Sequence, residues 1–317
     1  MTPRERTFWL RVQRRAQSLT PGMTRAFLRG LSALADELTE AELVALIETA
    51  SVDRVLARAY SEQAMERAFA ELREEIRGAT IDSSRWFLRD IPKATAIVFD
   101  TLSPRVLDAV RALDTRVIRT LGENIRATVR QHIERGLVEG VNPRTMARGL
   151  RSVIGLAPNQ EAAVANFRRM LLDGDREALT RALRDRRYDR TLERALGRSG
   201  DGLSADQVEK MTAAYRKRFI AFNAETNART ASLDSLKQAQ RLSWQESIAQ
   251  GVVDPDRLRK TWVTVGDNRV RPEHVEMNGE TVGFDDVFSN GEVVPGESTF
   301  NCRCLARVFQ AARASAV

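Results

Sequence analysis

One segment of the 317-residue chain, residues 104–137, constrains its fold more than any other. Apolar side chains recur there every three or four residues, at Val106, Val110, Leu113, Val117, Leu121, Ile125, Val129, Ile133 and Leu137. This spacing places them on one face of an α-helix. Ser103 suits the N-cap and Pro104 the first helical position. At 1.5 Å per residue the helix is roughly 50 Å long, which exceeds the diameter of a small domain. We therefore expect a stalk, or a helix packed into an assembly.

Further helices are predicted on both sides of this segment. Residues 1–90 have the pattern of short amphipathic helices, and residues 157–198 are helical and rich in arginine. Three predicted helix starts carry N-capping signals: Thr39 with Glu42, Asn142 with Pro143, and Ser204 with Gln207. The segment GRSGDGLS (197–204) predicts a linker. His132 lies beside the apolar face of the long helix, and we interpret it as a packed or surface histidine.

A polar stretch, NAETNART (223–230), interrupts the apolar face of the helix that follows the linker. Thr226 and Arg229 stand where apolar residues would continue that face. Glu225 precedes Arg229 by one turn, in the favourable i, i+4 order. Two interpretations stay open: an exposed salt bridge within the helix, or a cluster that braces the domain that follows.

Beyond these helices the pattern changes to strands. TWVTVGD (261–267) and CRCLARVF (302–309) alternate in the way that half-buried strands do. Asn278-Gly279 is a strong turn signal, so VEMNGETV (275–282) predicts a hairpin. We call residues 256–317 the C-terminal module; at about 60 residues it is small for a domain that stands alone.

The predicted architecture is mainly α with a small C-terminal α+β module, and its elongated helical N-terminal and middle regions include one long helix. Four regions follow one another: a helical region at 1–100, the long helix with an arginine-rich helical region at 101–200, a helical region with NAETNART at 201–255, and the C-terminal module at 256–317.

The chain is basic, with 50 Lys and Arg against 43 Asp and Glu, and only five of the 50 are lysine. Such a chain could contact nucleic acid. Most arginines, however, alternate with acids, as in DREALTRALRDRRYDRTLER (175–194), which is typical of a solvated helix face. MTPRERTFWLRVQRRAQ has no signal-peptide core, and no apolar run reaches the roughly 20 residues that cross a bilayer. We expect a protein folded in a cytosol, where stable disulfides are rare.

The only two cysteines, Cys302 and Cys304, lie one residue apart. On a strand both would point to one face, and Arg303 to the other. Together with His274 they could give zinc three soft ligands. A fourth ligand would have to be a carboxylate of the C-terminal module: Asp267, Glu273 or Asp285.

Two other interpretations of the thiols stay open. Both could pack as small hydrophobic side chains in the module's core. Alternatively, a cysteine and His274 could form a nucleophilic site oriented by Asp267. The chain has no G-x-S-x-G, phosphate-loop, H-E-x-x-H or G-x-G-x-x-G motif, so we predict that it is not an enzyme.

The order of residues in the C-terminal module resembles the signature of the phage Mu F-like family, the minor head or head morphogenesis proteins of tailed phages. The matching residues are Trp262, Asp267, Arg269, Arg271, His274, Gly279, Pro295, Asn301, Cys302, Arg303 and Cys304. NAETNART is similar to a family element that carries Glu225, Arg229 and Thr230, although Asn223 and Ala231 depart from it. GLVEGVNPRTMARGLRSVIGL (136–156) is similar to a helical family segment.

The resemblance implies a structural role for the site. Many relatives carry further cysteines and a histidine that look like a zinc-binding set, but here Arg271 and Thr299 stand at two of those positions. We expect no cofactor, with zinc on His274, Cys302 and Cys304 as the alternative. In place of a metal, we expect Arg269 and Arg271 to pair with nearby carboxylates: Asp267, Asp285 or Asp286.

The family implies a minor head protein, present inside the virion head and in the host cytoplasm during assembly. Its expected partners are the portal and other head proteins, and packaged DNA through non-specific arginine contacts. Neither a membrane nor a small-molecule substrate is expected. A sequence-independent DNA-binding protein and a zinc- or thiol-dependent enzyme are the alternatives.

Overall fold

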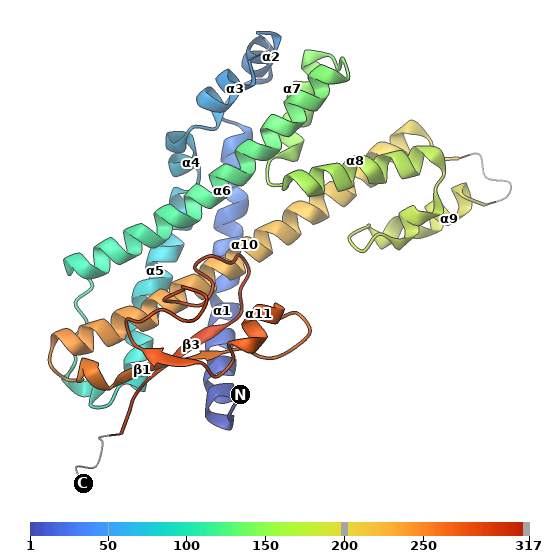
Figure 1. Cartoon of the computed structure of the whole chain (residues 1–317). Coiled ribbons are helices and arrows are strands. Elements are labelled where there is room, and N and C mark those ends of the chain that lie inside the picture. The colour runs from blue at the N-terminus through green and yellow to red at the C-terminus, as the bar shows by residue number, and fades with distance from the viewer. Residues whose placement is uncertain (50, 198–201, 313–317) are drawn as a thin grey trace. The chain divides into compact units, whose positions relative to one another are not determined.

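The computed structural model describes residues 1–49, 51–197 and 202–312. As predicted, these residues are mainly helical, with one small sheet near the C-terminal end (Figure 1). The helices are α1 (Pro3–Ala35), α2 (Glu40–Glu48), α3 (Val52–Ala59), α4 (Glu62–Ala68), α5 (Ala70–Phe87), α6 (Pro104–Val138), α7 (Pro143–Val153), α8 (Pro158–Asp173), α9 (Asp189–Ala195), α10 (Ala205–Ala249) and α11 (Pro272–Glu276). The strands are β1 (Leu258–Val263), β2 (Thr281–Gly283) and β3 (Leu305–Gln310). Most of the predicted linker, residues 198–201, lies outside the described residues.

The long helix predicted from apolar spacing is α6, with 35 residues. The predicted apolar face is buried except at two positions. Val117 is only half-buried, and its neighbour Ile118 is buried instead; Leu137 is exposed. All three predicted capping signals are present, at Thr39 with Glu42, at Asn142, and at Ser204 with Gln207.

The expectation of only short helices before residue 90 is wrong, because α1 has 33 residues and contains Pro21. A proline inside a helix removes one backbone hydrogen bond. Apolar side chains on both sides of Pro21 are nevertheless buried, among them Val12 and Met23. Their burial outweighs the local cost of the proline, so the helix continues through it.

Contacts between residues group the chain into two compact units. Unit 1 comprises Met1–Ala26, Glu71–Val117 and Thr226–Val317; unit 2 comprises Phe27–Ala70 and Ile118–Glu225. The helices α1, α6 and α10 each supply residues to both units. Both units therefore consist of separated segments, whereas the four regions predicted from the sequence are continuous.

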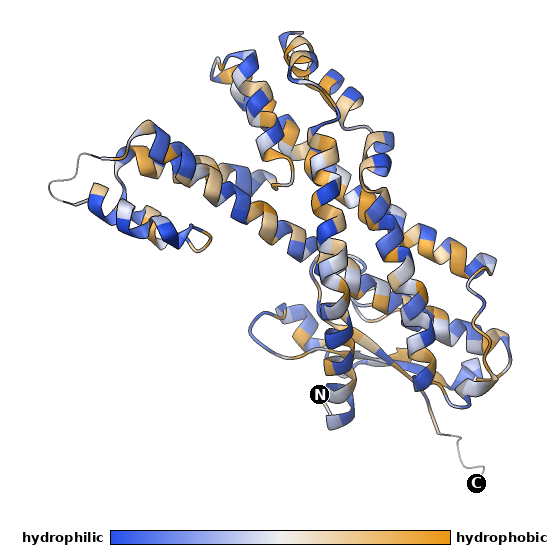
Figure 2. Cartoon of the chain, turned by 180° about the vertical axis from the view of Figure 1, so that it is seen from behind, coloured by the Kyte–Doolittle hydropathy of each residue, from blue (hydrophilic) through white to orange (hydrophobic). Residues whose placement is uncertain are grey.

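The long helices carry hydrophobic and hydrophilic residues along their whole length (Figure 2). Within the part of the chain that the structure describes, we find no helix with the length and apolar character needed to span a bilayer. In unit 2, His132 of α6 packs between its neighbours, with Nε2 3.3 Å from the Met146 carbonyl oxygen and Nδ1 3.6 Å from Glu161 Oε1. It is a packed histidine, as interpreted from the sequence.

The sheet of unit 1 has the order β2-β1-β3, and both pairings are antiparallel. One face packs on helices, where Val263 and Leu305 contact a cluster that includes Val12 of α1 and Leu236 of α10. On the other face, Trp262 packs with Phe288 and both cysteines in a second core. The sheet thus separates the helical core from the core that contains both cysteines.

Three strand predictions need correction. The first strand starts earlier and ends at Val263, because Gly266 has a positive φ of 71° and the chain leaves the sheet before it. The predicted hairpin at 275–282 is wrong: Pro272 starts α11, and only β2 pairs with β1. The final strand starts at Leu305, so Cys302 and Cys304 precede it.

Candidate thiol–imidazole site

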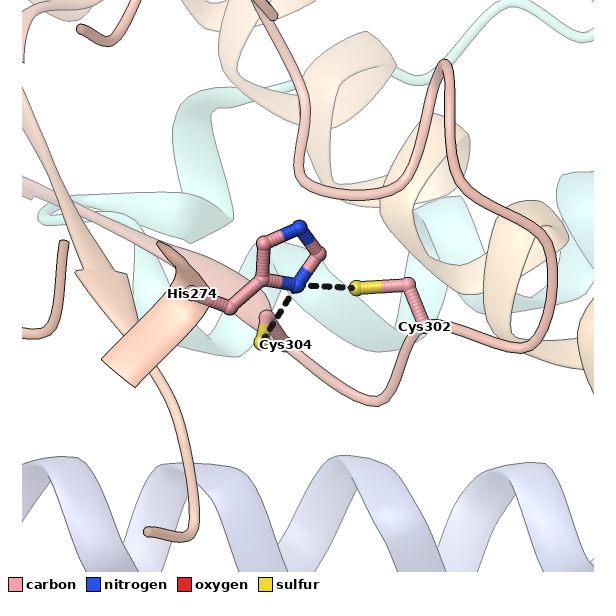
Figure 3. Close-up of side chains that lie close together, drawn as sticks. All are labelled: His274, Cys302 and Cys304. Carbon is pink, nitrogen blue, oxygen red and sulfur yellow. Dashed lines mark hydrogen bonds between the residues drawn. The ribbon is translucent and has the colours of Figure 1, made fainter. Parts of the chain in front are cut away.

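The structure brings His274, Cys302 and Cys304 together in unit 1 as a thiol–imidazole cluster. The Nδ1 atom of His274 lies 3.6 Å from Cys302 Sγ and 3.7 Å from Cys304 Sγ (Figure 3). His274 lies on α11, and the cysteines lie on the segment that enters β3. All three side chains are buried, with exposed fractions of 2–4%. The convergence predicted from the sequence is thus present.

Aromatic packing fixes the imidazole ring. The Trp262 ring on β1 meets the His274 ring edge to face at 5.2 Å between centroids, and it meets Phe288 in the same way at 5.1 Å. Trp262 is fully buried. Because His274 directly follows the Pro272-Glu273 start of α11, the helix and the indole together hold Nδ1 toward the two sulfurs.

A contact between two residues of the predicted motif orients the cysteine segment. Asn301 has a positive φ of 59°, a conformation that asparagine tolerates better than most residues. Its Oδ1 accepts a 2.8 Å hydrogen bond from Arg229 Nη2 on α10. Of the two interpretations of NAETNART, the brace is therefore correct for Arg229, whereas Glu225 is exposed.

The expected partners of Arg269 and Arg271 are wrong. Asp267 instead accepts two hydrogen bonds from Arg303, at 2.9 and 2.5 Å, and Asp285 pairs with Arg241 at 2.7 Å. Arg271 donates to the Phe300 carbonyl oxygen at 3.1 Å. Arginine therefore links the loop after β1 to the cysteine segment twice: Arg303 binds the Asp267 carboxylate, and Arg271 binds the Phe300 backbone carbonyl.

The remaining motif residues support the backbone of the module. Gly279 has a φ of 95° and donates its N–H to Trp262 O at 2.9 Å, which starts the β1–β2 pairing. Pro295 precedes Gly296, whose N–H is bound by Glu292 at 2.8 Å. Arg269 is exposed and donates its backbone N–H to Asp267. Thr230 bonds within α10, to the Thr226 carbonyl oxygen.

The hydrogen bond between the two thiols shifts their pKa values in opposite directions. A hydrogen bond from the Cys304 thiol, together with the positive charge of Lys237, lowers the pKa of Cys302 to about 6. The same hydrogen bond and burial raise the pKa of Cys304. Lys237 is buried, with Nζ 3.4 Å from the Cys302 carbonyl oxygen. Of the two thiols, Cys302 is therefore the more acidic.

Sequence reasoning missed three buried charged residues beside the cluster, of which Lys237 is one. Lys260, on β1, is 2% exposed, and its Nζ donates to Val293 O at 2.8 Å; burial lowers its pKa to about 8. Glu292 is also buried and binds the backbone N–H groups of Gly296 and Ser298. The available signal was the rarity of lysine: two of only five lysines, Lys237 and Lys260, are buried in this unit.

The cluster has the donor set and spacing for three corners of a zinc site. The three ligand atoms lie within 4.8 Å of one another. Neighbouring ligands of a tetrahedral zinc with Zn–S and Zn–N bonds of normal length are about 3.5–3.8 Å apart. Among the described residues, no fourth His, Cys or carboxylate joins the group, and the three proposed carboxylates lie outside it. A zinc held here by two thiolates and one imidazole would supply a structural cross-link and would need a fourth ligand from outside that set.

A family model matches this chain. The model of the family described as Phage Mu protein F like protein matches residues 127–307, more than half of the chain. The matched span includes α10, the three-stranded sheet up to Arg307, and the thiol–imidazole cluster. No curated protein matches. No solved structure matches either.

Proposed function

This chain belongs to the phage Mu F-like family of phage head morphogenesis proteins, and from that premise we propose that it is a minor head protein of the virion. In this proposal it associates with the portal on the interior side of the capsid and assists head assembly, DNA packaging or DNA ejection. The observation that carries the proposal is the family match over residues 127–307, which spans all of α10 and the cluster.

We propose a structural role for the thiol–imidazole cluster. Its three side chains are at most 4% exposed, so a substrate could not reach the nucleophilic sulfur without unfolding of the module. Two neighbours of the cluster also join separate segments: Arg229 joins α10 to Asn301, and Arg303 joins the segment before β3 to Asp267. These contacts support a module whose task is to hold a fixed surface for a partner, rather than to catalyse a reaction.

We further propose that the cluster holds this module together without a metal. The Arg271–Phe300 hydrogen bond joins the same two loops that a larger ligand set would join. The buried ammonium group of Lys237, whose positive charge acts on Cys302, also disfavours a divalent cation through charge repulsion. Elemental analysis of the purified full chain tests this point: one tightly bound zinc per chain would contradict it.

Virion incorporation tests the proposed function. The gene is deleted from the phage and complemented with the wild-type chain or with Arg229→Ala, and purified heads are analysed by quantitative mass spectrometry. We expect the wild-type chain in heads and in complexes with the portal ring, and less of the variant in both. The exposed Arg269→Ala is the matched control in the same unit. The proposal would be contradicted if the deletion phage gave a normal yield of infectious heads and the wild-type chain were absent from the heads of the complemented phage.

The same material separates this proposal from sequence-independent DNA binding. Retention on heads through non-specific phosphate contacts would be lost by about 0.2 M salt. We expect the portal complex to survive that salt concentration and treatment with nuclease, because a stable protein interface does not rest on phosphate contacts.

A further inference from the structure

Unit 1 contains a second feature that shares no residue with the thiol–imidazole cluster. A cavity of about 420 Å³ is bounded by α1, by β3, by the turn that follows α5, and by α10. Its lining includes Arg4, Arg11, Asp90, Trp244, Arg307, Val308 and Gln310. Its volume falls in the range of about 300–1,000 Å³ that is typical of ligand sites. The walls combine apolar rings with cationic side chains.

Positive charge dominates this cavity. Arg4, Arg11 and Arg307 line it, and Asp90 is the only carboxylate among the lining residues. Asp90 is already bound by Arg11, whose guanidinium also lies 5.0 Å from the Trp86 ring. In the described part of the chain, neither Arg4 nor Arg307 forms an ion pair. Two cations therefore stay without a carboxylate, so the cavity favours an anionic occupant.

The cavity wall is also rich in donors. The indole of Trp244 is 1% exposed, and its Nε1 has no hydrogen-bond acceptor within the described ranges. Arg11 Nε is in the same condition. Buried polar groups normally find partners, so these two donors are compatible with an acceptor supplied by an occupant of the cavity.

One side of the cavity is the unpaired edge of the sheet. Trp262 directs both its N–H and its C=O to the β2 side of β1, through Glu280 O and Gly279 N. Antiparallel ladders alternate, so Thr261 directs its groups to β3, where it pairs with Arg307. It follows that Val308 and Gln310 direct their N–H and C=O groups away from β1, and both residues line the cavity. No other strand pairs with β3 in the described ranges.

We propose that this edge and cavity bind an extended acidic segment of a partner protein. The segment adds as a strand beside β3, its main chain pairs with Val308 and Gln310, and an acidic side chain reaches Arg4 and Arg307. Alternate residues of a strand face the same side, so a segment that alternates apolar and acidic residues suits a wall made of both rings and arginines. This inference goes beyond the proposed function and stands independently of it.

The backbone edge distinguishes a peptide from a nucleic acid as the occupant. A strand edge presents N–H and C=O groups in alternation, which only another main chain satisfies along its length. DNA phosphates offer acceptors alone, and they would leave the outward C=O groups of β3 unpaired. Charge complementarity and the edge together therefore favour an acidic peptide.

Fluorescence anisotropy with the full chain and a fluorescein-labelled peptide of alternating Val and Glu tests the proposal. The double variant Arg4→Glu/Arg307→Glu is compared with Arg6→Glu/Arg269→Glu, which makes the same change of charge at exposed residues on α1 and in the C-terminal module that do not line the cavity. We expect Kd to rise by about tenfold or more in the first variant and by less than about twofold in the second. Thermal unfolding of both variants checks that they are folded.

A second peptide isolates the strand edge. It has the same sequence with N-methyl groups on every second amide, in both possible registers, so its charge is unchanged while edge pairing is blocked. We expect both N-methylated peptides to bind at least about tenfold more weakly. The proposal would be overturned if the N-methylated peptides, or a peptide of alternating Val and Gln, bound the wild-type chain as tightly as the Val-Glu peptide does. It would also be overturned if Arg4→Glu/Arg307→Glu bound the Val-Glu peptide as tightly as the wild-type chain, or if the wild-type chain did not bind it. Complete displacement by a random DNA duplex of equal charge would also overturn it.

Discussion

Arg303 donates two hydrogen bonds to Asp267, at 2.9 and 2.5 Å, although 36 residues separate them in the sequence. Arg303 stands between Cys302 and Cys304, and its side chain leaves the buried cluster to reach a partly exposed carboxylate. The hydrogen bonds from Arg303, together with its positive charge, lower the pKa of Asp267. The ion pair therefore anchors, from the solvent side, the segment whose buried side carries the thiols.

A double-mutant cycle on Arg303 and Asp267 tests this anchor. We expect a coupling free energy of about 1 kcal/mol between Arg303→Ala and Asp267→Ala, because the ion pair is bidentate but partly exposed. Arg303→Lys keeps the charge and loses the planar fork, so it should recover less than half of that coupling. Urea unfolding of the four proteins measures it.

The matched control for this cycle is the Arg111–Asp108 pair on α6. That pair is 3.7 Å apart, and its side chains are 71% and 74% exposed. We expect a coupling below about 0.3 kcal/mol there. Equal coupling in the two cycles would show that the Arg303–Asp267 geometry contributes nothing special.

Substitution of His274 separates the roles of its ring and its nitrogen. His274→Ala removes a buried ring that contacts Trp262 and both sulfurs, and we expect a loss of about 2–4 kcal/mol in the free energy of unfolding. His274→Phe keeps the aromatic contact and removes Nδ1, so its loss should be smaller. Denaturant unfolding measures both. A larger loss for Phe than for Ala would refute the view that ring packing is the main contribution.

Removal of metal gives the sharpest test of the metal-free cluster. A structural zinc contributes an apparent free energy of about 10–16 kcal/mol at neutral pH, so its chelation would unfold a module that depends on it. We expect dialysis against EDTA to change the Tm of the full chain by less than about 2 °C. Circular dichroism before and after dialysis measures the change, and a large fall that added zinc reverses would contradict the expectation.

Two helical glycines offer a matched test of packing. A Cβ at Gly30 on α1 would lie 2.3 Å from the Phe69 ring, whereas a Cβ at Gly78 on α5 meets nothing within 4 Å. We expect Gly30→Ala to destabilise the protein by about 1–3 kcal/mol through overpacking. Gly78→Ala should stabilise it by about 0.5–1 kcal/mol through helix propensity. Thermal unfolding decides; stabilisation by both substitutions would show that Phe69 moves aside at no cost.

Periodicity in the sequence predicts α6 well and α1 poorly, for a physical reason. The apolar face of α6 is regular, and its start carries Ser103 and Pro104. In α1, Pro21 and Gly22 are local signals that end helices, but burial of the apolar residues on both sides outweighs them. Such tertiary burial depends on segments far apart in the sequence, so a local pattern cannot show it.

The same limit applies to the site. The C-x-C pair and one histidine were enough to predict the convergence of His274 with both thiols. The partners of the arginines were mispredicted because 45 arginines compete for 43 acids, and a long side chain reaches several of them. Sequence spacing does not choose among such partners; the fold of the loop after β1 does.

The pH dependence of stability provides a last test, on Asp185 in unit 2. Hydrogen bonds from Arg187, with the charge of Arg218, hold the pKa of Asp185 at about 2, below its usual value near 4. The folded-state pKa is the lower one, so the unfolded state binds more protons between pH 4 and 2. The stabilisation is therefore complete above about pH 4 and is lost as the pH falls toward 2.

Because both arginines are substantially exposed, we expect the Asp185 carboxylate to contribute only about 1 kcal/mol to the free energy of unfolding. Urea unfolding from pH 5 to pH 2.5 should show the wild-type advantage over Asp185→Asn shrinking by more than half of that amount, whereas the advantage over the exposed Asp108→Asn should stay constant. An advantage over Asp185→Asn that grew on acidification would show that the arginines do not stabilise the carboxylate.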